Sequence, residues 1–261
     1  MAAGVPRGEL IVVKLGGTTL ADQRAVLDEV AARSRTDRIV LVHGGGKRLT
    51  EWLSRMGVES RFEGGLRVTD DAALEVALAV LRGVINAELV SVLQAGGADA
   101  VGLCGVDGGL LISERIPSLG RVATVTGARA GLLDAILATG ALPVIAPLAL
   151  DQDGVICNVN GDDAAAGLAG ALGARLVLLT DTDGVRGADG TRIAAITDTE
   201  TEALIASGVI SGGMVPKVRC SLRALAWGAP ETVIADGAAV DALRRALDDA
   251  GFGTRSRRSE S

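Results

Sequence analysis

The sequence predicts an α/β fold built on a parallel sheet, from three observations that recur along the chain. Short β-branched apolar runs, such as Leu10 to Val13 and Arg38 to His43, are typical of buried parallel strands. Glycines close each run, and amphipathic stretches follow at Ala21 to Arg33 and Lys47 to Met56. Strand, glycine turn and helix in this order indicate βαβ units, which require a parallel sheet.

The same pattern continues through the rest of the chain. Further buried strands are expected at Ala100 to Cys104, Leu142 to Pro147, Arg175 to Thr180 and Glu231 to Ala235. Leu110 to Val125 alternates and predicts β-hairpins. Helices are expected at Asp71 to Gln94 (interrupted at Gly83), Leu132 to Thr139, Glu200 to Ser207, Val215 to Trp227 and Ala238 to Ala250. A further, Ala-rich helix is expected to follow Asp163 and to run to about Leu172.

Composition narrows the classes of function. The 261 residues are 48 % apolar and 22 % charged, as in a globular protein. A net charge of −6, no Tyr, two Phe and two Trp argue against a nucleic-acid partner. Three separated cysteines favour a reducing cytoplasm over a disulfide framework. The longest uncharged run, Ala135 to Leu150, is too short to span a membrane, and we expect neither a span nor a signal peptide.

Lysine is scarce in this chain. Lys and Arg total 26, but only Lys14, Lys47 and Lys217 are lysines, and each lies close to glycines. An ammonium group is a compact point charge, which suits contact with a phosphoryl group better than a planar guanidinium does. Lys14 stands where a strand opens into a glycine turn, and Lys217 stands in a first helical turn, where it opposes the helix dipole. A bound anion would offset that cost.

Three further features point to a polar site. Asn158, Asn160, Asp162 and Asp163 precede a helix and outnumber what capping needs. The segment Glu63 to Asp70 is interpreted as a glycine loop before a helix capped by Asp70 or Thr69. Arg67 in this loop is a candidate clamp for a carboxylate. His43, the single histidine, is interpreted as structural rather than catalytic, and His-based metal sites are excluded.

The triple glycine Gly44 to Gly46 matches no common nucleotide motif. A P-loop requires Gly and Ser/Thr where Leu41 and Arg48 stand. The dinucleotide fingerprint fails at Arg48 and Leu49, which excludes a nicotinamide dehydrogenase. Glycine still allows the backbone to approach a ligand and direct N–H groups at it.

Seven ordered motifs carry a resemblance to a known family. The chain resembles the amino acid kinase family, and within it the acetylglutamate kinases, from about Leu10 to Gly253. The resemblance implies a three-layer αβα sandwich with a mostly parallel central sheet and two lobes. Residues 9–173 would bind the amino acid substrate and form a dimer contact, residues 174–253 would bind ATP, and 254–261 would be a disordered tail. The motifs are VVKLGG from Val12, VHGGG from Val42, GLRVTD from Gly65, GVDGG from Gly105, NVNGDDAA from Asn158, LLTDTDGV from Leu178 and GGMVPKV from Gly212.

The same resemblance implies roles for individual residues. Lys14 and Lys217 would stabilise the transferred phosphoryl group, with Asp162 orienting both lysines. Gly44 and Gly45 would donate N–H groups to the γ-carboxylate of N-acetyl-L-glutamate and to the phosphoryl oxygens, and Arg67 and Asn158 would hold the α-carboxylate of the substrate. Mg²⁺ would arrive on ATP, with no metal site of the protein's own. Nucleotide contacts would come from Gly16, Gly17, Thr180, Asp181, Asp183, Gly184, Val185, Arg186, Val209, Ser211, Gly212 and Gly213.

Departures from the family pattern leave alternatives open. Gly161 stands where acetylglutamate kinases usually have Ala, and the kinase for carrier-bound α-aminoadipate tends to have Gly there, whereas Asn160 follows the acetylglutamate pattern. A non-catalytic amino acid or nucleotide sensor on the same fold is a third reading. Only nine residues precede the first strand, so we expect an arginine-insensitive homodimer in contact through the helix Asp71 to Gln94.

Overall fold

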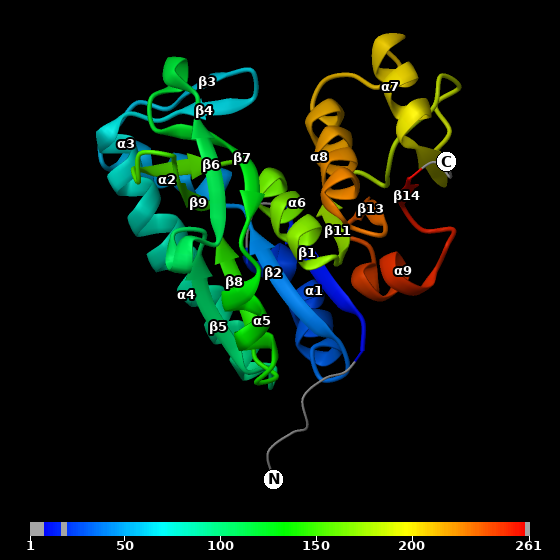
Figure 1. Ribbon diagram of the computed structural model, residues 1–261, viewed down its shortest axis with the longest axis horizontal. Coiled ribbons are helices and arrows are strands. Elements are labelled where there is room, and N and C mark those ends of the chain that lie inside the picture. Colours follow the sequence, from blue (N-terminus) through cyan, green and yellow to red (C-terminus); the bar gives the residue numbers. More distant parts are fainter. Residues whose placement is uncertain (1–7, 17–19, 259–261) are drawn as a thin grey trace.

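The computed structural model describes residues 8–16 and 20–258, and within these ranges the main sheet has eight strands. Their order is β12-β14-β13-β11-β1-β2-β8-β5, with the first-numbered strand near the middle (Figure 1). Every pairing is parallel except that of β13 with β14. The strands are β1 (Leu10–Leu15), β2 (Arg38–His43), β5 (Ala100–Cys104), β8 (Leu142–Ala146), β11 (Arg175–Thr180), β12 (Ala195–Thr197), β13 (Thr232–Asp236) and β14 (Thr254–Arg257).

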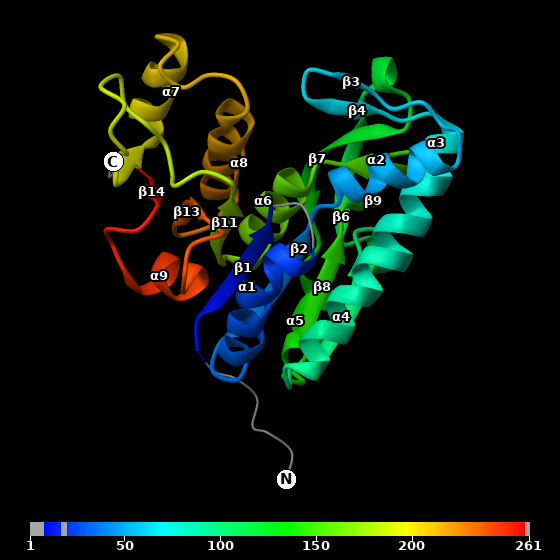
Figure 2. The ribbon, with the colours of Figure 1, turned by 180° about the vertical axis from the view of Figure 1, so that it is seen from behind.

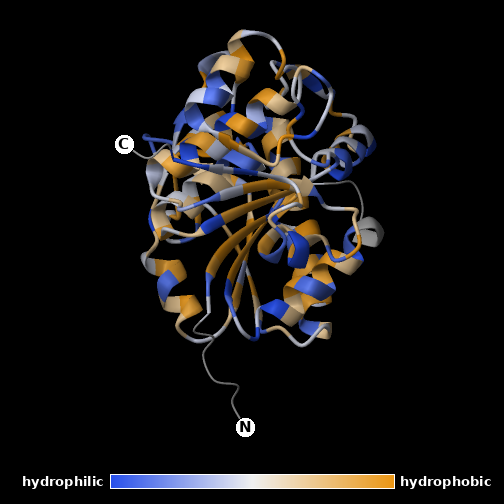
Figure 3. Cartoon of the chain, turned by 90° about the vertical axis from the view of Figure 1, so that its right-hand side faces the viewer, coloured by the Kyte–Doolittle hydropathy of each residue, from blue (hydrophilic) through white to orange (hydrophobic). Residues whose placement is uncertain are grey.

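Helices cover both faces of this sheet, as Figures 1 and 2 show from opposite sides. Alternate residues of β1 point to opposite faces, so Ile11, Val13 and Leu15 enter one apolar core and Val12 enters the other. The first core is closed by α1 (Leu20–Arg33), α2 (Gly46–Arg55), α3 (Asp71–Ala77), the π-helix η1 (Leu78–Ile85), α4 (Asn86–Ala95) and α9 (Ala242–Asp248). The second is closed by α5 (Gly131–Leu137), α6 (Gly161–Leu172) and α8 (Met214–Trp227). Figure 3 shows the apolar strands between these layers, and the expected three-layer αβα sandwich is confirmed.

A smaller β-structure stands over the carboxyl ends of the sheet. In the described part of the chain, a closed four-stranded barrel forms from β6 (Leu111–Arg115), β7 (Val122–Ala128), β9 (Leu148–Leu150) and β10 (Ile156–Val159). Short 3-10 turns, η2 (Asp107–Gly109) and η3 (Pro117–Leu119), flank β6. A separate hairpin joins β3 (Arg61–Glu63) to β4 (Leu66–Val68).

The hairpin corrects the expected glycine loop. Gly64 and Gly65 form its two-residue turn with φ of 56° and 82°, a left-handed conformation that suits a hairpin and favours glycine. Arg67 therefore lies in a strand, paired across the hairpin with Phe62, and not in a loop. Asp70 caps α3 by accepting a hydrogen bond from the Ala73 N–H at 2.8 Å.

Helix α6 is enclosed by the sheet, by β7 and by α8, and its composition explains how. Ala164, Ala165, Ala166 and Ala169 are fully buried, because these turns of the helix are packed between the sheet, β7 and α8. A Cβ on Gly170 would lie 2.4 Å from Trp227 of α8, and one on Gly167 would lie 2.8 Å from Val125 of β7. Small residues thus let α6 sit in the middle of the molecule, where its first turn reaches the carboxyl ends of the strands.

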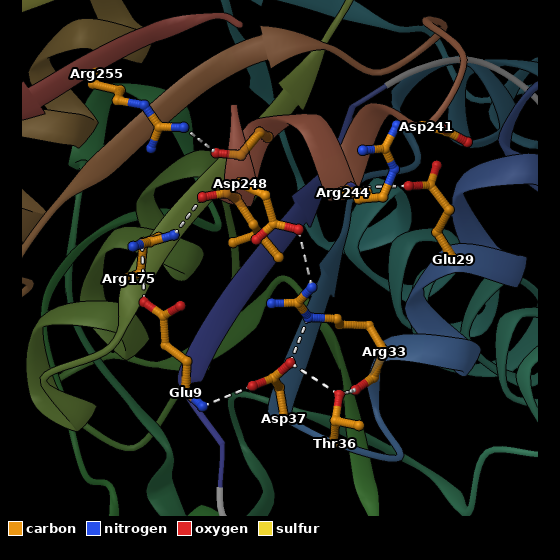
Figure 4. Close-up of polar contacts among 12 residues, drawn as sticks. Glu9, Glu29, Arg33, Thr36, Asp37, Arg175, Asp241, Arg244, Asp248 and Arg255 are labelled. Atoms are coloured by element: carbon orange, nitrogen blue, oxygen red, sulfur yellow. Dashed lines mark hydrogen bonds and ion pairs between the residues drawn. The ribbon is translucent and has the colours of Figure 1, made fainter. Parts of the chain in front are cut away.

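The expected disordered tail is wrong for Thr254 to Arg257. These residues form β14, which pairs antiparallel with β13 and parallel with β12. Arg255 is 8 % exposed and forms an ion pair with buried Glu231 at 2.9 Å, close to Arg175 (Figure 4). The sequence looked disordered because of its arginines, but a carboxylate in another element neutralises them. Residues 259–261 lie outside the described residues.

The chain from Asp71 to Ala95 runs as one helix through α3, η1 and α4. In the described residues it is the one helix long and apolar enough to cross a membrane by length and composition, and 39 % of its apolar stretch is buried within the protein.

α7 (Asp198–Ala206) begins at a capping box made by Thr197 and Glu200. The division into lobes at residues 173 and 174 stays a prediction.

Candidate active site

The candidate site lies where the central parallel strands end. Lys14 is in register with Val42 of β2 and Leu178 of β11, so the three strands finish side by side. The glycines that follow His43 and the first turn of α6 meet at the same edge, where a Cβ on Gly161 would lie 3.3 Å from the His43 carbonyl oxygen. Ligands bind at this edge in open α/β sheets.

Two lysines share one carboxylate at this edge. The Lys14 Nζ lies 2.6 Å from Asp162 Oδ1, and the Lys217 Nζ lies 3.3 Å from Asp162 Oδ2. The three side chains are 11 %, 20 % and 9 % exposed for Lys14, Lys217 and Asp162. The structure therefore brings together residues from β1, α6 and α8 that the sequence analysis grouped. Two positive charges against one negative charge leave a net positive centre for an anion.

Asp162 is ionised in this arrangement. Burial alone would raise the pKa of its carboxyl, but the charges of Lys14 and Lys217 outweigh burial, and the pKa lies below its ordinary value. Asp181, at the end of β11, also has a lowered pKa, first because Thr180 Oγ1 donates to it at 2.9 Å and further because both lysines attract its charge. Asp181 thus lies in the electrostatic reach of the lysine pair.

Each polar residue before α6 has a separate partner. Asn160 is the N-cap and accepts from the Asp162 N–H at 2.7 Å. Asp163 pairs with Arg223 and accepts from the Cys220 thiol at 2.9 Å. Asn158 donates to Thr69 Oγ1 at 3.4 Å. The surplus over capping that the sequence indicated is therefore divided between the lysine centre and neighbouring elements.

A cavity of about 180 Å³ opens beside the lysine centre. The four residues expected to bind the amino acid substrate, Gly44, Gly45, Arg67 and Asn158, all line it. Gly161 also lines it, and its missing Cβ would lie 3.4 Å from Lys14 Cε. The other walls were not predicted, because most of their residues are apolar and carry no functional signal in the sequence. They are Leu49, Phe62, Leu66, Leu81, Val122, Pro147 and Val159, with Gly46, Gly65 and Asn160 at the edges.

Arg67 is the unusual charge in this cavity. Its residue is 7 % exposed, and its guanidinium donates to Thr50 Oγ1 at 2.8 Å, to the Gly46 carbonyl at 3.0 Å and to Ser60 Oγ. It stacks 4.6 Å from the Phe62 ring. Among the described residues it has no carboxylate partner, and burial lowers the pKa of the guanidinium. A buried cation without an anion favours an anionic ligand.

A second cavity, also about 180 Å³, lies on the other side of the sheet edge. Gly184, Val185, Arg186, Val209 and Ser211, five of the expected nucleotide contacts, line it, together with Thr182, Ile210 and Met214. Met214 lies outside the segments that were expected to bind the nucleotide. Thr180, Asp181, Asp183, Gly212 and Gly213 flank these residues in sequence but are not in its lining. The Gly16 N–H donates to the Leu179 carbonyl at 2.7 Å, close to Thr180. Gly17 lies outside the described residues.

A third cavity, of about 630 Å³, separates the β3–β4 hairpin from α8. It shares Gly65, Leu66 and Asn160 with the smaller cavity beside the lysines, so the two are adjacent. One face of α8, with Val215, Arg219, Leu222, Arg223 and Ala226, forms its far wall. The spacing of these residues along a helix could be recognised in the sequence. No pattern in the sequence indicated that the hairpin lies opposite them.

Lys47 and His43, which the sequence did not assign to the site, have simpler surroundings. Lys47 is exposed in the first turn of α2. His43 is buried, and burial first and the Lys14 charge second lower the pKa of its ring to about 4, against the opposing hydrogen bond to Gly44. The imidazole is therefore neutral at pH 7. Among the described residues no cluster of three or more His, Cys, Asp or Glu could hold a metal ion.

The chain is similar to known proteins over most of its length. The profile described as the amino acid kinase family matches residues 9–236. The acetylglutamate kinase of Solibacter usitatus is 44 % identical over 252 residues, which cover 94 % of this chain and 98 % of that protein. The acetylglutamate kinase of Rubrobacter xylanophilus is 44 % identical over 245 residues, covering 94 % and 95 %. N-acetylglutamate synthase from Neisseria gonorrhoeae, solved with coenzyme A and N-acetyl-glutamate, shares the fold at a TM-score of 0.82 and 22 % identity, covering 98 % of this chain and 61 % of that one.

Proposed function

Because the chain belongs to the amino acid kinase family, we propose that it is an acetylglutamate kinase. It transfers the γ-phosphoryl group of ATP to the γ-carboxylate of N-acetyl-L-glutamate and forms the acyl phosphate, the second step of arginine biosynthesis. The observation that carries this proposal is the shared Asp162, which joins Lys14 and Lys217 beside a cavity holding the buried, anion-free Arg67.

The chemistry fits this arrangement. Arg67 and Asn158 bind the α-carboxylate of the substrate, and the N–H groups of Gly44 and Gly45 face its γ-carboxylate. One oxygen of that carboxylate attacks the γ-phosphorus, and the bond to the β–γ bridging oxygen breaks, so ADP leaves. A carboxylate is ionised at neutral pH, so no general base is required. Lys14 and Lys217 neutralise the charge that spreads over the phosphoryl oxygens.

ATP is assigned to the cavity lined by Thr182, Arg186 and Met214, whose lining begins two residues after the end of β11 at Thr180. We expect Mg²⁺ to arrive on ATP, because magnesium commonly keeps phosphate and water ligands. When bound, it would offset phosphate charge. The negative charge of Asp162 offsets the repulsion between the two ammonium groups, and its two oxygens fix the positions of both.

The two other readings have less support. A sensor that does not catalyse would be expected to lose its phosphate-binding lysines, whereas both are in place on one carboxylate. Carrier-bound α-aminoadipate as the acceptor was suggested by Gly161, which lines the cavity. The relatives named acetylglutamate kinase that cover nearly the whole chain support N-acetyl-L-glutamate instead.

We further propose a homodimer in the cytoplasm. The helix Asp71–Ala95 exposes Ala79, Gly83 and Ala87 at four-residue intervals, so another helix can approach closely. β5, at the free edge of the main sheet, exposes Val101 beside it. The three free cysteines are buried and unpaired with one another, which suits a reducing compartment. Light scattering at micromolar protein would test the dimer, and a monomer mass would contradict it.

The activity is tested by trapping the acyl phosphate. The protein is incubated with MgATP, N-acetyl-L-glutamate and hydroxylamine, and the hydroxamate is measured. Glutamate and N-acyl-α-aminoadipate serve as alternative acceptors, and the Asp162→Asn variant as the control. We expect hydroxamate with N-acetyl-L-glutamate above the other acceptors. No hydroxamate above background with the wild-type protein would refute the proposal.

A further inference from the structure

His43 is buried at the site but takes no part in the proposed chemistry. It is the single histidine of the chain, it is 2 % exposed, and it ends β2 directly before the glycines. Both ring nitrogens have a partner: Nδ1 lies 2.7 Å from the Gly44 carbonyl oxygen, and Nε2 lies 3.2 Å from Asn86 Nδ2. A fully engaged ring in this place calls for an explanation.

The surroundings of Asn86 determine which ring nitrogen carries the proton. Its Nδ2 lies 2.9 Å from the Val144 carbonyl and 3.3 Å from the Leu103 carbonyl. Both are acceptors only, so this end of the side chain must be the NH₂ group. His43 Nε2 therefore accepts, and the proton is on Nδ1, which donates to the Gly44 carbonyl.

Asn86 is itself fixed by its helix. It is 1 % exposed and follows the π-helix η1, and Arg82 donates to its Oδ1 at 3.4 Å. The same segment packs on the glycines, because a Cβ on Gly45 would lie 2.6 Å from both Leu81 and Ile85. In a π-helix, residues four and five apart share a face, so one wider turn reaches both Gly45 and His43.

The hydrogen bond from His43 sets the orientation of one peptide group. In a trans peptide the carbonyl oxygen of Gly44 and the N–H of Gly45 point in opposite directions. Holding the oxygen toward His43 turns the Gly45 N–H away from the ring. Gly45 is also the N-cap of α2 and lines the cavity beside the lysines, where a backbone N–H at a helix start suits an anion.

We infer that Asn86 and His43 are positioning residues for the reaction. Asn86 fixes the Nδ1–H tautomer of His43, and His43 holds the Gly44–Gly45 peptide so that its N–H faces the acceptor carboxylate and the transferred phosphoryl group. Neither side chain touches the substrate. This inference rests on the proposed function, because the value of the N–H depends on a carboxylate acceptor in that cavity.

The charged groups around the ring are compatible with a neutral imidazole. Lys14 lies on one side and lowers the pKa of His43. Arg82 stands beyond Asn86, and its charge is balanced by Asp107, whose Oδ2 lies 3.5 Å away. A protonated ring would place a donor against the NH₂ group of Asn86, so protonation would break that contact.

The tautomer can be observed directly, because the untagged chain has one histidine. In the ¹⁵N-labelled protein at pH 7, we expect ring nitrogen shifts of the Nδ1–H form, without titration above pH 5. In Asn86→Leu we expect loss of this single form. An Nε2–H ring in the wild type, or a ring titrating near 6.5, would overturn the inference whatever the enzyme turns over.

Two substitutions of His43 separate positioning from packing. Asn places an amide nitrogen close to Nδ1 and can still donate to Gly44, although it leaves a cavity. Leu fills the space but cannot donate. We expect His43→Asn to keep at least tenfold more kcat than His43→Leu, with KM for ATP within twofold in both. Equal kcat values, or a more active Leu variant, would show that only packing counts.

Asn86→Leu has a matched control on the same helix. Gln94 also donates its amide to a backbone carbonyl, that of Ala100 at 3.3 Å, but two turns farther from the glycines. We expect kcat to fall about tenfold to a hundredfold in Asn86→Leu, as for a misplaced reacting group, and to stay at the wild-type value in Gln94→Leu.

An Asn86→Leu variant with wild-type kcat would refute the positioning role and leave the proposed function standing. A wild-type protein that shows no turnover of N-acetyl-L-glutamate would refute the proposed function, and the positioning role with it.

Discussion

Two buried carboxylates gather cations at opposite ends of the parallel strands. Asp162 lies at the carboxyl ends and binds Lys14 and Lys217. Glu231 lies just before β13, at the amino ends, and contacts Arg175 at 3.2 Å, Arg255 at 2.9 Å and Arg257 at 2.5 Å. Figure 4 shows Arg175 and Arg255 at this second end, with Glu9 within reach of Arg175.

The difference lies in how the cations are used. Both terminal nitrogens of Arg255 are engaged, one by Glu231 and the other by the Ala246 and Asp249 carbonyls at 2.9 Å. Among the described residues Lys14 and Lys217 have Asp162 as their polar partner, and each ammonium has three hydrogens. Each lysine therefore keeps donors for a ligand, whereas the terminal nitrogens of Arg255 are used within the fold. The arginine cluster at Glu231 therefore stabilises the fold, whereas the lysine cluster at Asp162 can also bind a ligand.

The strongest test of this contrast is Lys14→Arg, which keeps the charge. A guanidinium is longer and planar, so it cannot occupy the same point beside Asp162. We expect kcat to fall by about 10²–10³, with the urea midpoint nearly unchanged. Steady-state kinetics and urea unfolding measure both. Near-normal turnover would remove the distinction between the two clusters.

At the other end we expect the opposite pattern from Glu231→Gln. Removing the shared charge leaves the buried Arg255 without its anion, which costs about 3 kcal/mol of unfolding free energy. Because the site is remote, kcat at 25 °C should stay within twofold. Urea unfolding and the hydroxamate assay on the same sample provide the measurement. A large loss of kcat with intact stability would contradict the structural role.

A third test uses the pH dependence of stability near the lysine end. The ring of His43 has a pKa of about 4 when folded and 6.5 as its ordinary value. Between these values the unfolded chain binds a proton that the folded chain does not, so stability falls as the pH falls below 6.5, by about 1.4 kcal/mol per unit and about 3 kcal/mol in all. Asp162 contributes below this window, because its lowered pKa keeps its stabilisation in place until the pH falls under about 3.8. Urea titrations from pH 7.5 to 5 should show the slope in the wild type and lose it in His43→Leu.

A milder test replaces Arg255 by Lys. The charge beside Glu231 remains, but the bonds to Ala246 and Asp249 are lost, and we expect a cost of about 1–2 kcal/mol. Activity should not change. Thermal and urea unfolding report the effect, and an unaffected stability would mean that charge alone holds β14.

The smallest effect is expected at the surface. Arg24 and Asp28 form an exposed pair, with side chains 57 % and 52 % exposed. Arg24→Gln should cost no more than about 0.5 kcal/mol. This variant calibrates the urea experiments, and a loss comparable to that of Glu231→Gln would show that burial does not set the value of an ion pair here.

Local patterns were enough to predict much of the fold and part of the candidate site. The buried run at Arg175 to Thr180 matched β11, and the glycine after Val13 and Lys14 located the sheet edge, because these signals are carried by adjacent residues. Arg67 was placed in a loop since two glycines precede it, although they turned out to form a hairpin turn. A pattern of glycines alone does not distinguish a turn from a loop.

What the sequence could not predict depends on distant partners. Arg255 and Arg257 were predicted to lie in a disordered tail, because Glu231, the carboxylate that pairs with both, is distant in sequence and precedes β13. The contact between His43 and Asn86 spans 43 residues and arises from a π-helical turn with no sequence signal that we recognised. The cavity between the β3–β4 hairpin and α8 could not be predicted either, because its two walls are distant in sequence.

The position of β1 in the sheet order has a consequence for biosynthesis. Within this sheet β1 is synthesised before the other strands; β2 follows on one side, but its other neighbour, β11, begins only at residue 175. At cellular rates of translation, that edge of the nascent chain waits roughly 10–30 s for its partner. Asp162 and Lys217 also arrive late, so no amino-terminal fragment can assemble the lysine centre, and premature termination yields an inert, exposed β-edge that chaperones must shield.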